Sequence, residues 1–263
     1  MSPSVALLLK RGSGFHEVVP LLEQNGLDVD VRYPEEDIVD LTKLRPEHDL
    51  YVLKSRTPAA LSLGGALHAA GAAILNPYPV AAACRDKIVA SQLLRRAGVP
   101  LPETFVAGDA SRLTPLLASG PLVVKPHRGS KGEGVRIVRS ADELEAANGD
   151  GGPVFAQRFR EPRGRDRKIY RIGEGIFGVK RVWPARSADE KHGEPFAVGG
   201  ELRDIALRLG EALGLDLYGF DVVLTDDGPF VVDFSPFPGF KGVPDAPALL
   251  ADYIAGAVRR AAR

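Results

Sequence analysis

The sequence is poor in cysteine and has no long apolar run. Its 263 residues include a single cysteine, Cys84, so the chain cannot form an internal disulfide or bind a metal through several thiolates. The apolar run near the N-terminus, residues 5–9, is too short for a signal peptide, and no segment reaches the roughly 18 apolar residues of a membrane span. We therefore expect a cytoplasmic protein that makes no membrane contact.

An excess of charge of one sign is also absent. The chain has 34 lysines and arginines and 34 aspartates and glutamates, so its formal net charge at pH 7 is zero. Proteins that bind nucleic acid are usually basic, so we expect no nucleic-acid partner. The five histidines show no metal-binding spacing such as H-E-x-x-H, and no Ser-His-Asp or Cys-His set is evident. The sequence gives no decisive sign of oligomeric state.

Strand and helix patterns alternate over residues 1–80, which we expect to form an N-terminal domain. The sequence predicts helices at residues 15–26 and 58–71, and strands at residues 4–10, 27–33, 48–55 and 72–76. Such alternation predicts a parallel sheet with helices on its faces, an α/β, Rossmann-like unit. Because parallel sheets bind ligands at the carboxyl ends of their strands, two residues after the third strand are candidate substrate contacts, Lys54 and Arg56.

The chain after residue 80 combines helices with hairpins, which is typical of an α+β arrangement. Residues 80–98 predict one helix that ends at Gly98, just before Pro100. Later patterns predict hairpins that turn at residues 173–175 and 226–228, and helices at residues 199–215 and 245–263. We expect a smaller unit at residues 81–155 and a larger one at residues 156–263.

The stretch KPHRGSKGEGV, residues 125–135, has the composition of a phosphate-binding loop. It lacks the Gly-Lys-Ser/Thr of the Walker pattern, and a strand rather than a helix follows it. We therefore expect a flap between two antiparallel strands, whose backbone N–H groups can cover phosphates. Lys125 would add a point charge. A plain flexible hairpin turn is the alternative.

A second feature is the acidic hairpin GFDVVLTDDGPFVVDFSPFPGF. A three-residue loop at residues 226–228 would place Asp221 opposite Asp233 across the two strands. Two facing carboxylates repel each other unless a cation lies between them. Ser235 points the same way as Asp233, and such hard oxygen ligands suit Mg²⁺ that also binds substrate phosphates. The alternative, a solvent-facing sheet with incidental acids, fits poorly with the apolar neighbours.

Together these motifs resemble the ATP-grasp superfamily. The stretches that carry the resemblance are CRDKIVASQLLRRAGVPLPETF, PLVVKPHRGSKGEGVRIV, VFAQRF, DRKIYRIG and the acidic hairpin, in that order over roughly residues 80–245. The resemblance is strongest to the RimK-like carboxylate–amine ligases and implies an ATP-grasp fold after an N-terminal α/β domain. The stretch FPGFKGVP, residues 237–244, also resembles inositol polyphosphate kinases of the same fold.

The resemblance implies a nucleotide site. Lys87 and Lys125 match the two family lysines that contact the nucleotide phosphates, and the lid over the phosphates matches Gly129, Ser130, Gly132 and Gly134. The strand whose backbone holds the adenine matches Gln157, Arg158 and Phe159. In the family, an acidic side chain usually binds the ribose of the nucleotide, and the candidates here are Asp166 and Glu161. A basic position in the same segment matches Lys168.

The resemblance also implies a metal site and a substrate site. Asp221 and Asp233 match the two acidic metal ligands, whereas Ser235 departs from the usual asparagine and has a shorter reach. Arg158 departs too, because an acidic residue is common at that position. Arg181 and Arg186 are candidate phosphate or substrate cations and, with Lys125, the candidate catalytic residues. Lys241 is a further candidate substrate residue.

The implied reaction is that of an ADP-forming carboxylate–amine ligase that uses ATP with Mg²⁺, or Mn²⁺, and proceeds through an acylphosphate. Its partners would be a small molecule or peptide with a carboxylate, and an amine co-substrate. Two alternatives stay open: a kinase of a small polyol or inositol phosphate, and a nucleotide-binding protein without catalysis. The basic stretch at residues 158–171 has seven basic residues and two acids. It could be an anion pocket, a solvated loop or a nucleic-acid patch, and we favour the first.

Overall fold

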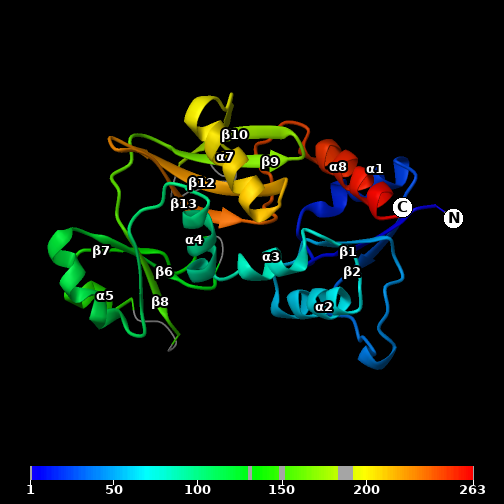
Figure 1. The fold of residues 1–263 in the computed structure, drawn as a ribbon, viewed down its shortest axis with the longest axis horizontal. Helices are drawn as coiled ribbons and strands as arrows, with labels where there is room; N and C mark the ends of the chain where they lie inside the picture. The colour runs from blue at the N-terminus through cyan, green and yellow to red at the C-terminus, as the bar shows by residue number, and fades with distance from the viewer. Residues whose placement is uncertain (1, 130–131, 148–151, 183–191, 263) are drawn as a thin grey trace.

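The computed structural model describes residues 2–129, 132–147, 152–182 and 192–262, which form three sheets (Figure 1). The first is a four-stranded parallel sheet with the order β2-β1-β3-β4. The second has four strands in the order β5-β8-β6-β7, and the third has five in the order β11-β10-β9-β12-β13. The predicted α/β class is therefore confirmed. No helix among the described residues is long and apolar enough to cross a membrane.

The parallel sheet predicted for the N-terminal unit is present. Its strands are β1 (Ser4–Leu8), β2 (Asp28–Arg32), β3 (Leu50–Leu53) and β4 (Ile74–Leu75). Helices α1 (Val19–Gln24) and α2 (Pro58–Ala69) connect them, with short 3₁₀ turns at Phe15–Glu17 and Leu41–Lys43. Strand β1 is buried from Val5 onward, which explains why its sequence is continuously apolar rather than alternating.

The single helix predicted at residues 80–98 is wrong, because the chain breaks there into two helices. They are α3 (Tyr78–Ala83) and α4 (Lys87–Arg96). Asp86 is the N-cap of α4, and its carboxylate accepts a hydrogen bond from the backbone N–H of Ile88 at 2.9 Å. The break carries the chain from the N-terminal unit to the rest of the molecule (Figure 1). It leaves Arg85 outside either helix.

The smaller of the two remaining sheets contains the glycine-rich segment. Its strands are β5 (Thr104–Ala107), β6 (Leu122–Pro126), β7 (Arg136–Val138) and β8 (Val154–Arg158). The 3₁₀ helix η3 (Ala110–Ser119) and helix α5 (Ala141–Glu145) pack against it, and Leu113, Val124 and Leu144 share one core. Strands β6 and β7 are antiparallel, so the prediction that the glycine segment joins two antiparallel strands is confirmed.

The five-stranded sheet forms the centre of the molecule. Its strands are β9 (Asp166–Ile172), β10 (Gly175–Arg181), β11 (Glu194–Phe196), β12 (Leu217–Thr225) and β13 (Gly228–Ser235). The sequence did not predict β11. Helices α4 and α7 (Gly200–Leu213) cover one face of this sheet, where Leu94, Ile205 and Leu209 pack against Phe220 and Val231.

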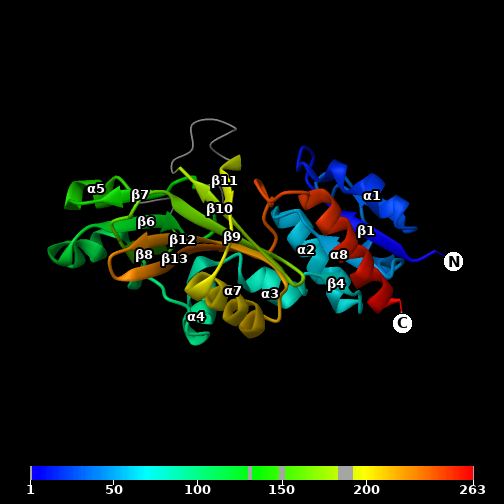
Figure 2. The same cartoon turned by 90° about the horizontal axis from the view of Figure 1, so that it is seen from above.

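The C-terminal helix α8 (Ala246–Ala261) returns to the N-terminal unit. It lies beside α1, and the two ends of the chain lie near each other (Figure 2). Ile254 and Val258 of α8 share a core with Leu7 and Leu22 of the N-terminal unit. This core also includes Phe237 and Phe240, so the segment after β13 joins the central sheet to the N-terminal unit. The division of the chain at residues 80 and 155 stays a prediction.

Candidate active site

The two acids of the hairpin lie opposite each other, although not by the predicted route. Thr225 pairs with Gly228, so the turn contains two residues and the predicted three-residue loop is wrong. A β-bulge between Asp221 and Val222 shifts the register by one residue and restores the pairing of Asp221 with Asp233. Val232 is the extra residue of the bulge. The predicted pairing of the carboxylates is therefore confirmed, and its cause is the bulge.

Lys125 crosses from the small sheet to this bulge. Its ammonium donates hydrogen bonds to the side-chain oxygen of Gln157 at 2.7 Å and to the carbonyl of Val232 at 2.8 Å. The side chain is buried, and no ion pair between described residues includes it. Burial lowers the pKa of Lys125 to about 8, an effect that the nearby Asp233 partly offsets. An ammonium has three N–H groups, so one remains for a ligand.

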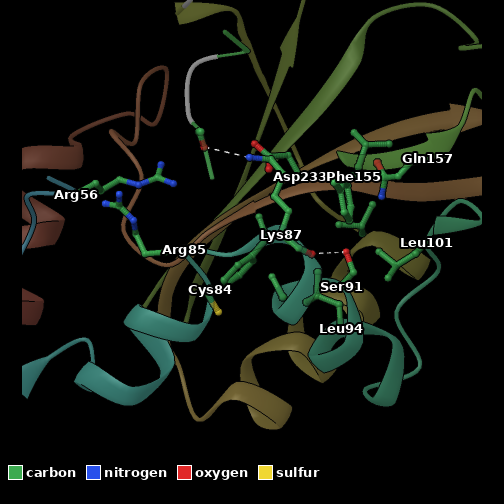
Figure 3. A pocket seen from close by; sticks show the side chains of 15 residues that line it. Arg56, Cys84, Arg85, Lys87, Ser91, Leu94, Leu101, Phe155, Gln157 and Asp233 are labelled. Carbon is green, nitrogen blue, oxygen red and sulfur yellow. Dashed lines mark hydrogen bonds between the residues drawn. The ribbon is translucent and has the colours of Figure 1, made fainter. Parts of the chain in front are cut away.

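Lys87 lies in the first turn of α4 and faces the same space. Its ammonium donates to the carbonyl of Gly129 at 3.0 Å, and its backbone N–H donates to the carbonyl of His127 at 2.9 Å. Burial lowers the pKa of Lys87, while Asp233 raises it and Arg56 lowers it further. Figure 3 shows the Lys87 side chain beside Asp233. The break before α4 therefore brings a second lysine to the acidic hairpin.

The glycine segment begins and ends close to β6. Gly132 and Gly134 have φ angles of 75° and 71°, which favour glycine. A Cβ atom on Gly134 would lie 2.8 Å from the side chain of Pro126, so the returning chain also needs a glycine for space. Ser130, a predicted lid contact, lies outside the described residues. Contact of this segment with phosphate stays a prediction.

Strand β9 adds an acid and a base to the site. Lys168 pairs in register with Asp221 on β12, and its ammonium lies 2.8 Å from a carboxylate oxygen of Asp221. Asp166, two residues earlier, is partly buried, and burial followed by the charge of Asp221 raises its pKa to about 6. Lys168, Asp221 and Asp233 thus form a row across three adjacent strands.

The metal prediction can be tested against the chemistry of these donors. No group of three or more His, Cys, Asp and Glu side chains suited to a metal occurs among the described residues. Mg²⁺ is often held by one or two carboxylates together with phosphate oxygens and water, so facing Asp221 and Asp233 fit that ion. Ser235 pairs with Gly219 on the same hairpin, and the Arg56 guanidinium donates to its hydroxyl at 3.5 Å. Direct ligation by Ser235 stays a prediction.

The predicted adenine segment lies at the C-terminal end of β8, and its neighbouring side chains have different surroundings. The side chain of Gln157 is buried at the site, where it accepts from Lys125. The Arg158 side chain serves the small sheet, because it donates to the carbonyls of Leu116 at 3.1 Å and Gly120 at 2.5 Å. The backbone N–H groups of Arg158 and Phe159 also donate to carbonyls of neighbouring chain segments. Glu161, the second ribose candidate, is exposed.

Two other predicted cations have protein partners. Arg181 donates from Nη2 to the hydroxyl of Tyr170 at 2.5 Å and to the backbone carbonyl of Lys241 at 3.0 Å. The Lys241 residue is exposed. Lys54 donates to the carbonyls of Phe237 at 3.2 Å and Pro238 at 3.0 Å, so it ties the N-terminal sheet to the segment after β13. Arg186 lies outside the described residues.

The basic stretch at residues 158–171 pairs largely with acids. Ion pairs join Arg160 to Asp227 at 3.3 Å, Arg163 to Asp226 at 2.5 Å and Arg165 to Glu194 at 3.1 Å. Arg163 and Arg165 are exposed. This arrangement is that of a solvated, ion-paired surface, so the anion pocket that we favoured is wrong for these three arginines.

A pocket lies between α4, the small sheet and the end of the acidic hairpin (Figure 3). Its polar lining includes Lys87, Gln157, Asp233, Arg56 and Arg85, and its apolar lining includes Leu94, Leu101 and Phe155. Arg85 was not among the predicted site residues, because the continuous helix predicted at residues 80–98 included it. The signal that could have found it is Asp86, a favourable N-cap residue.

Comparison with known proteins agrees with this geometry. The family model described as a RimK-like ATP-grasp domain matches residues 84–252. The chain belongs to the RimK-like ATP-grasp family. The matched residues include both lysines, the glycine segment, the acidic hairpin and Arg85. The predicted family and the predicted ATP-grasp fold are confirmed.

Similar proteins extend the comparison. A probable alpha-L-glutamate ligase of Citrobacter koseri is 31% identical over 183 residues, which cover 64% of this chain but only 61% of that relative. The crystal structure of a RimK-domain ATP-grasp protein from Sphaerobacter thermophilus has a TM-score of 0.75 at 23% identity and covers 95% of this chain and 99% of that chain. The ATP-grasp ligase PsnB, complexed with a minimal precursor, Mg and ADP, has a TM-score of 0.72 at 22% identity and covers 99% and 97%. The structural matches support the fold alone.

Proposed function

We propose that this RimK-like ATP-grasp protein is an ADP-forming ligase that joins a carboxylate to an amine. The observation that supports it most strongly is the convergence of Lys87, Lys125, Asp221 and Asp233 on one space. These residues come from α4, β6 and the β12–β13 hairpin, which are far apart in the sequence. Two lysines beside two facing acids are the charges needed to hold a nucleotide triphosphate together with a divalent ion.

ATP would bind between the small sheet and the central sheet. Lys125 is a buried ammonium with a free N–H and a lowered pKa, so a phosphate oxygen there would compensate its lost hydration. Lys87 would contact the phosphates from α4. The adenine beside Gln157 to Phe159 and the ribose at Asp166 stay proposals of the same kind.

Asp221 and Asp233 would hold Mg²⁺, and Mn²⁺ would suit the same oxygen ligands. When bound, the ion would neutralise part of the negative charge of the phosphates. Lys168 already contacts one oxygen of Asp221 at 2.8 Å, so that carboxylate would be shared between the lysine and the ion. We expect this sharing to fix the position of Asp221 and to limit how tightly the site holds the metal without nucleotide.

The reaction would require no nucleophilic side chain. A carboxylate oxygen of the substrate attacks the γ-phosphorus of ATP, the bond to the β-phosphate oxygen breaks, and ADP leaves. The amine then attacks the acyl carbon, and phosphate leaves as the amide forms and the amine loses a proton. The protein would orient the reactants and stabilise charge. Burial raises the pKa of the Cys84 thiol to about 12, so this residue of the pocket wall is not a thiolate near neutral pH.

The substrate would be a carboxylate-bearing small molecule or peptide, with a primary amine as the second reactant. Relatives named glutamate ligases and a solved ATP-grasp ligase bound to a precursor support that general kind. The matched region spans less than two thirds of the glutamate ligase's length, so we carry over no specific acid or amine.

The test is a product assay with pools of acids and amines. With ATP and Mg²⁺, the protein should release equal amounts of ADP and phosphate, and an amide should appear by mass spectrometry. At the Mg²⁺ concentration that half-saturates the wild type, Asp233→Asn should strongly reduce both products, whereas Asp226→Asn, on the exposed turn of the same hairpin, should preserve them. Release of AMP, or phosphate retained on the acceptor, would contradict the ligase proposal.

The kinase alternative has less support. It rested on FPGFKGVP, yet Phe237 and Phe240 of that stretch are core residues and Lys54 binds the backbone of Phe237 and Pro238. The segment therefore has a structural role that does not require a phosphorylated substrate. A kinase would give a phosphorylated acceptor without free phosphate, and a non-catalytic nucleotide-binding protein would bind ATP without turnover, so the same assay separates all three.

A further inference from the structure

Two arginines that the proposed ligase chemistry does not use lie side by side in the pocket. Arg56 follows β3 of the N-terminal unit, and Arg85 lies in the break between α3 and α4. Figure 3 shows their guanidinium groups next to each other, on the far side of Lys87 from Gln157. Neither arginine takes part in an ion pair within the described ranges, in contrast to the arginines of residues 158–171.

Few guanidinium N–H groups of Arg56 and Arg85 have a hydrogen-bond acceptor among the described residues. Nη1 of Arg85 is buried and has no hydrogen-bond partner in the described part of the chain. Among the residues that the structure describes, the one hydrogen-bond partner of the Arg56 side chain is the hydroxyl of Ser235, at 3.5 Å. Burial lowers the pKa of both groups, although arginine stays protonated at neutral pH. The charge of Asp233 partly offsets this lowering at Arg56, whereas the charge of Arg56 lowers the pKa of Arg85 further. Two adjacent cations with unused donors are costly without an anion to bridge them.

The arginine pair also separates two cavities. One is the pocket that contains Lys87 and Asp233, and the other is a smaller cavity between the N-terminal unit, α3 and the segment after β13. Apart from the two arginines, the smaller cavity is lined by Leu53, Ser55, Leu61, Asn76, Ala81, Pro236 and Phe237. Each cavity therefore has access to the same pair of guanidinium groups.

Apart from the two arginines, the polar side chains that line the smaller cavity already have hydrogen-bond partners. The Asn76 side-chain amide donates to the backbone carbonyls of Leu217, at 2.7 Å, and Pro236. The Ser55 hydroxyl is hydrogen-bonded with that of Thr57 at 3.1 Å. No cation other than the two arginines lines this cavity among the described residues. Its remaining wall is mostly aliphatic and aromatic, so it suits an uncharged body.

We infer that Arg56 and Arg85 bind the carboxylate that becomes phosphorylated, and that the smaller cavity holds a small, uncharged and mainly apolar body of the same acid. This inference rests on the proposed ligase function. If Lys87 and Lys125 hold the phosphates, the arginines lie beyond Lys87 on the side away from Gln157, where an attacking carboxylate would approach the terminal phosphate. A guanidinium pair suits a planar carboxylate because each group can donate two parallel N–H bonds.

The experiment measures binding without turnover. Calorimetric titrations would use the full chain with Mg²⁺ and a non-hydrolysable ATP analogue, and the probes would be acetate, propionate, butyrate, succinate and propylphosphonate. We expect affinity to rise from acetate to butyrate and succinate to bind more weakly than butyrate. Arg85→Gln should weaken butyrate binding at least about tenfold, Arg85→Lys should weaken it less, and Arg160→Gln should leave it unchanged.

The cavity is tested separately from the arginines. Leu61 is partly buried in the wall of the smaller cavity, so Leu61→Phe should weaken butyrate more than acetate. Comparable melting temperatures of all variants would show that they are folded. Failure of every acid to bind, equal affinity of wild type and Arg85→Gln, or tighter binding of succinate than of butyrate would overturn the inference. Tighter binding of propylphosphonate than of butyrate would also overturn it, in favour of a phosphorylated acceptor.

The outcome is distinguishable from that of the ligase assay. If acids bind through Arg85 but no amide forms with any amine, the carboxylate site stands and the ligase proposal fails. If Arg85→Gln turns over ATP with a wild-type KM for the acid, the ligase proposal stands and the carboxylate site fails.

Discussion

Two regions of this molecule are rich in cations, and they differ in their partners. The stretch at residues 158–171 is the denser in the sequence, yet Arg160, Arg163 and Arg165 each face an acid. The pocket cations are scattered along the chain: Lys87, Arg56 and Arg85 line the pocket, and Lys125 donates to Gln157 and Val232 of its wall. None of these four takes part in an ion pair among the described residues. Burial lowers the pKa of each of these four.

The difference shows that the density of basic residues does not locate an anion site. An exposed ion pair contributes roughly 0–1 kcal/mol, and its charges are already neutralised. A buried cation without a counter-ion costs free energy that a bound anion can offset. The pocket cations therefore carry the stronger indication of a ligand, although the sequence draws attention to the other region.

The strongest test of this difference removes Lys125, the most buried of the four cations. Lys125→Met should weaken the binding of a non-hydrolysable ATP analogue by about 2–5 kcal/mol, because a hydrogen-bonded buried charge is lost from the site. The melting temperature should stay the same or rise, since an unpaired buried charge is also removed. Titration calorimetry and thermal unfolding measure the two effects. An affinity within about threefold of wild type would contradict the assignment of Lys125 to phosphate.

The acids of the hairpin give a second contrast. Asp233 lies among the pocket cations, whereas Asp226 is on the turn and pairs with exposed Arg163. Asp233→Asn should raise the Mg²⁺ concentration that half-saturates ADP release by about tenfold or more, because one of two carboxylate ligands is lost. Asp226→Asn should leave the Mg²⁺ titration unchanged. Equal Mg²⁺ dependence of wild type and Asp233→Asn would exclude this acid as a ligand.

The pH dependence of binding provides a third test. Burial lowers the pKa of Lys125 to about 8, so its ammonium loses its proton above that pH and the affinity for the ATP analogue should fall by up to about tenfold per pH unit. Lys125→Arg should flatten this decline, since a guanidinium stays protonated. The unfolded chain binds more protons between pH 8 and the ordinary value of 10.5, so the free energy of unfolding should rise with pH over that range.

Lys54 is the matched control for this pH effect. Burial lowers its pKa to about 8 as well, but its ammonium donates to the carbonyls of Phe237 and Pro238, which do not line the pocket that contains Asp233. Lys125 instead donates to Gln157 and Val232, which do. Lys54→Met should therefore retain the decline in nucleotide affinity above pH 8. Loss of the decline in this variant would show that Lys125 is not the titrating group.

The smallest effect is expected in the ion-paired stretch. Arg163→Gln should change the free energy of unfolding by less than about 0.5 kcal/mol, because both partners of its pair with Asp226 are exposed. Nucleotide affinity should match that of wild type. Chemical denaturation and calorimetry measure both quantities. A large loss of nucleotide affinity would show that residues 158–171 contribute to anion binding.

Local sequence features predicted much of this site. Gly129 to Gly134 lie between strands whose alternation is evident in the sequence, so their antiparallel pairing could be predicted. The acids Asp221 and Asp233 could be paired because they lie at similar distances from a turn. The predicted loop was one residue too long, and the pairing held only because Val232 forms a bulge. A bulge depends on the neighbouring strand, so spacing could not reveal it.

Most strands and helices and the pairing of the two acids were thus predictable from the sequence alone, because periodicity, turn residues and caps act over a few neighbouring positions. Lys87 and Lys125 were singled out by the family resemblance. The tertiary structure decided which charges lack partners. It placed Arg56 beside Arg85, paired Arg160 with Asp227, and turned the Val232 carbonyl to Lys125. Each of these contacts joins residues from separate elements, and only packing determines which side chains meet across such distances.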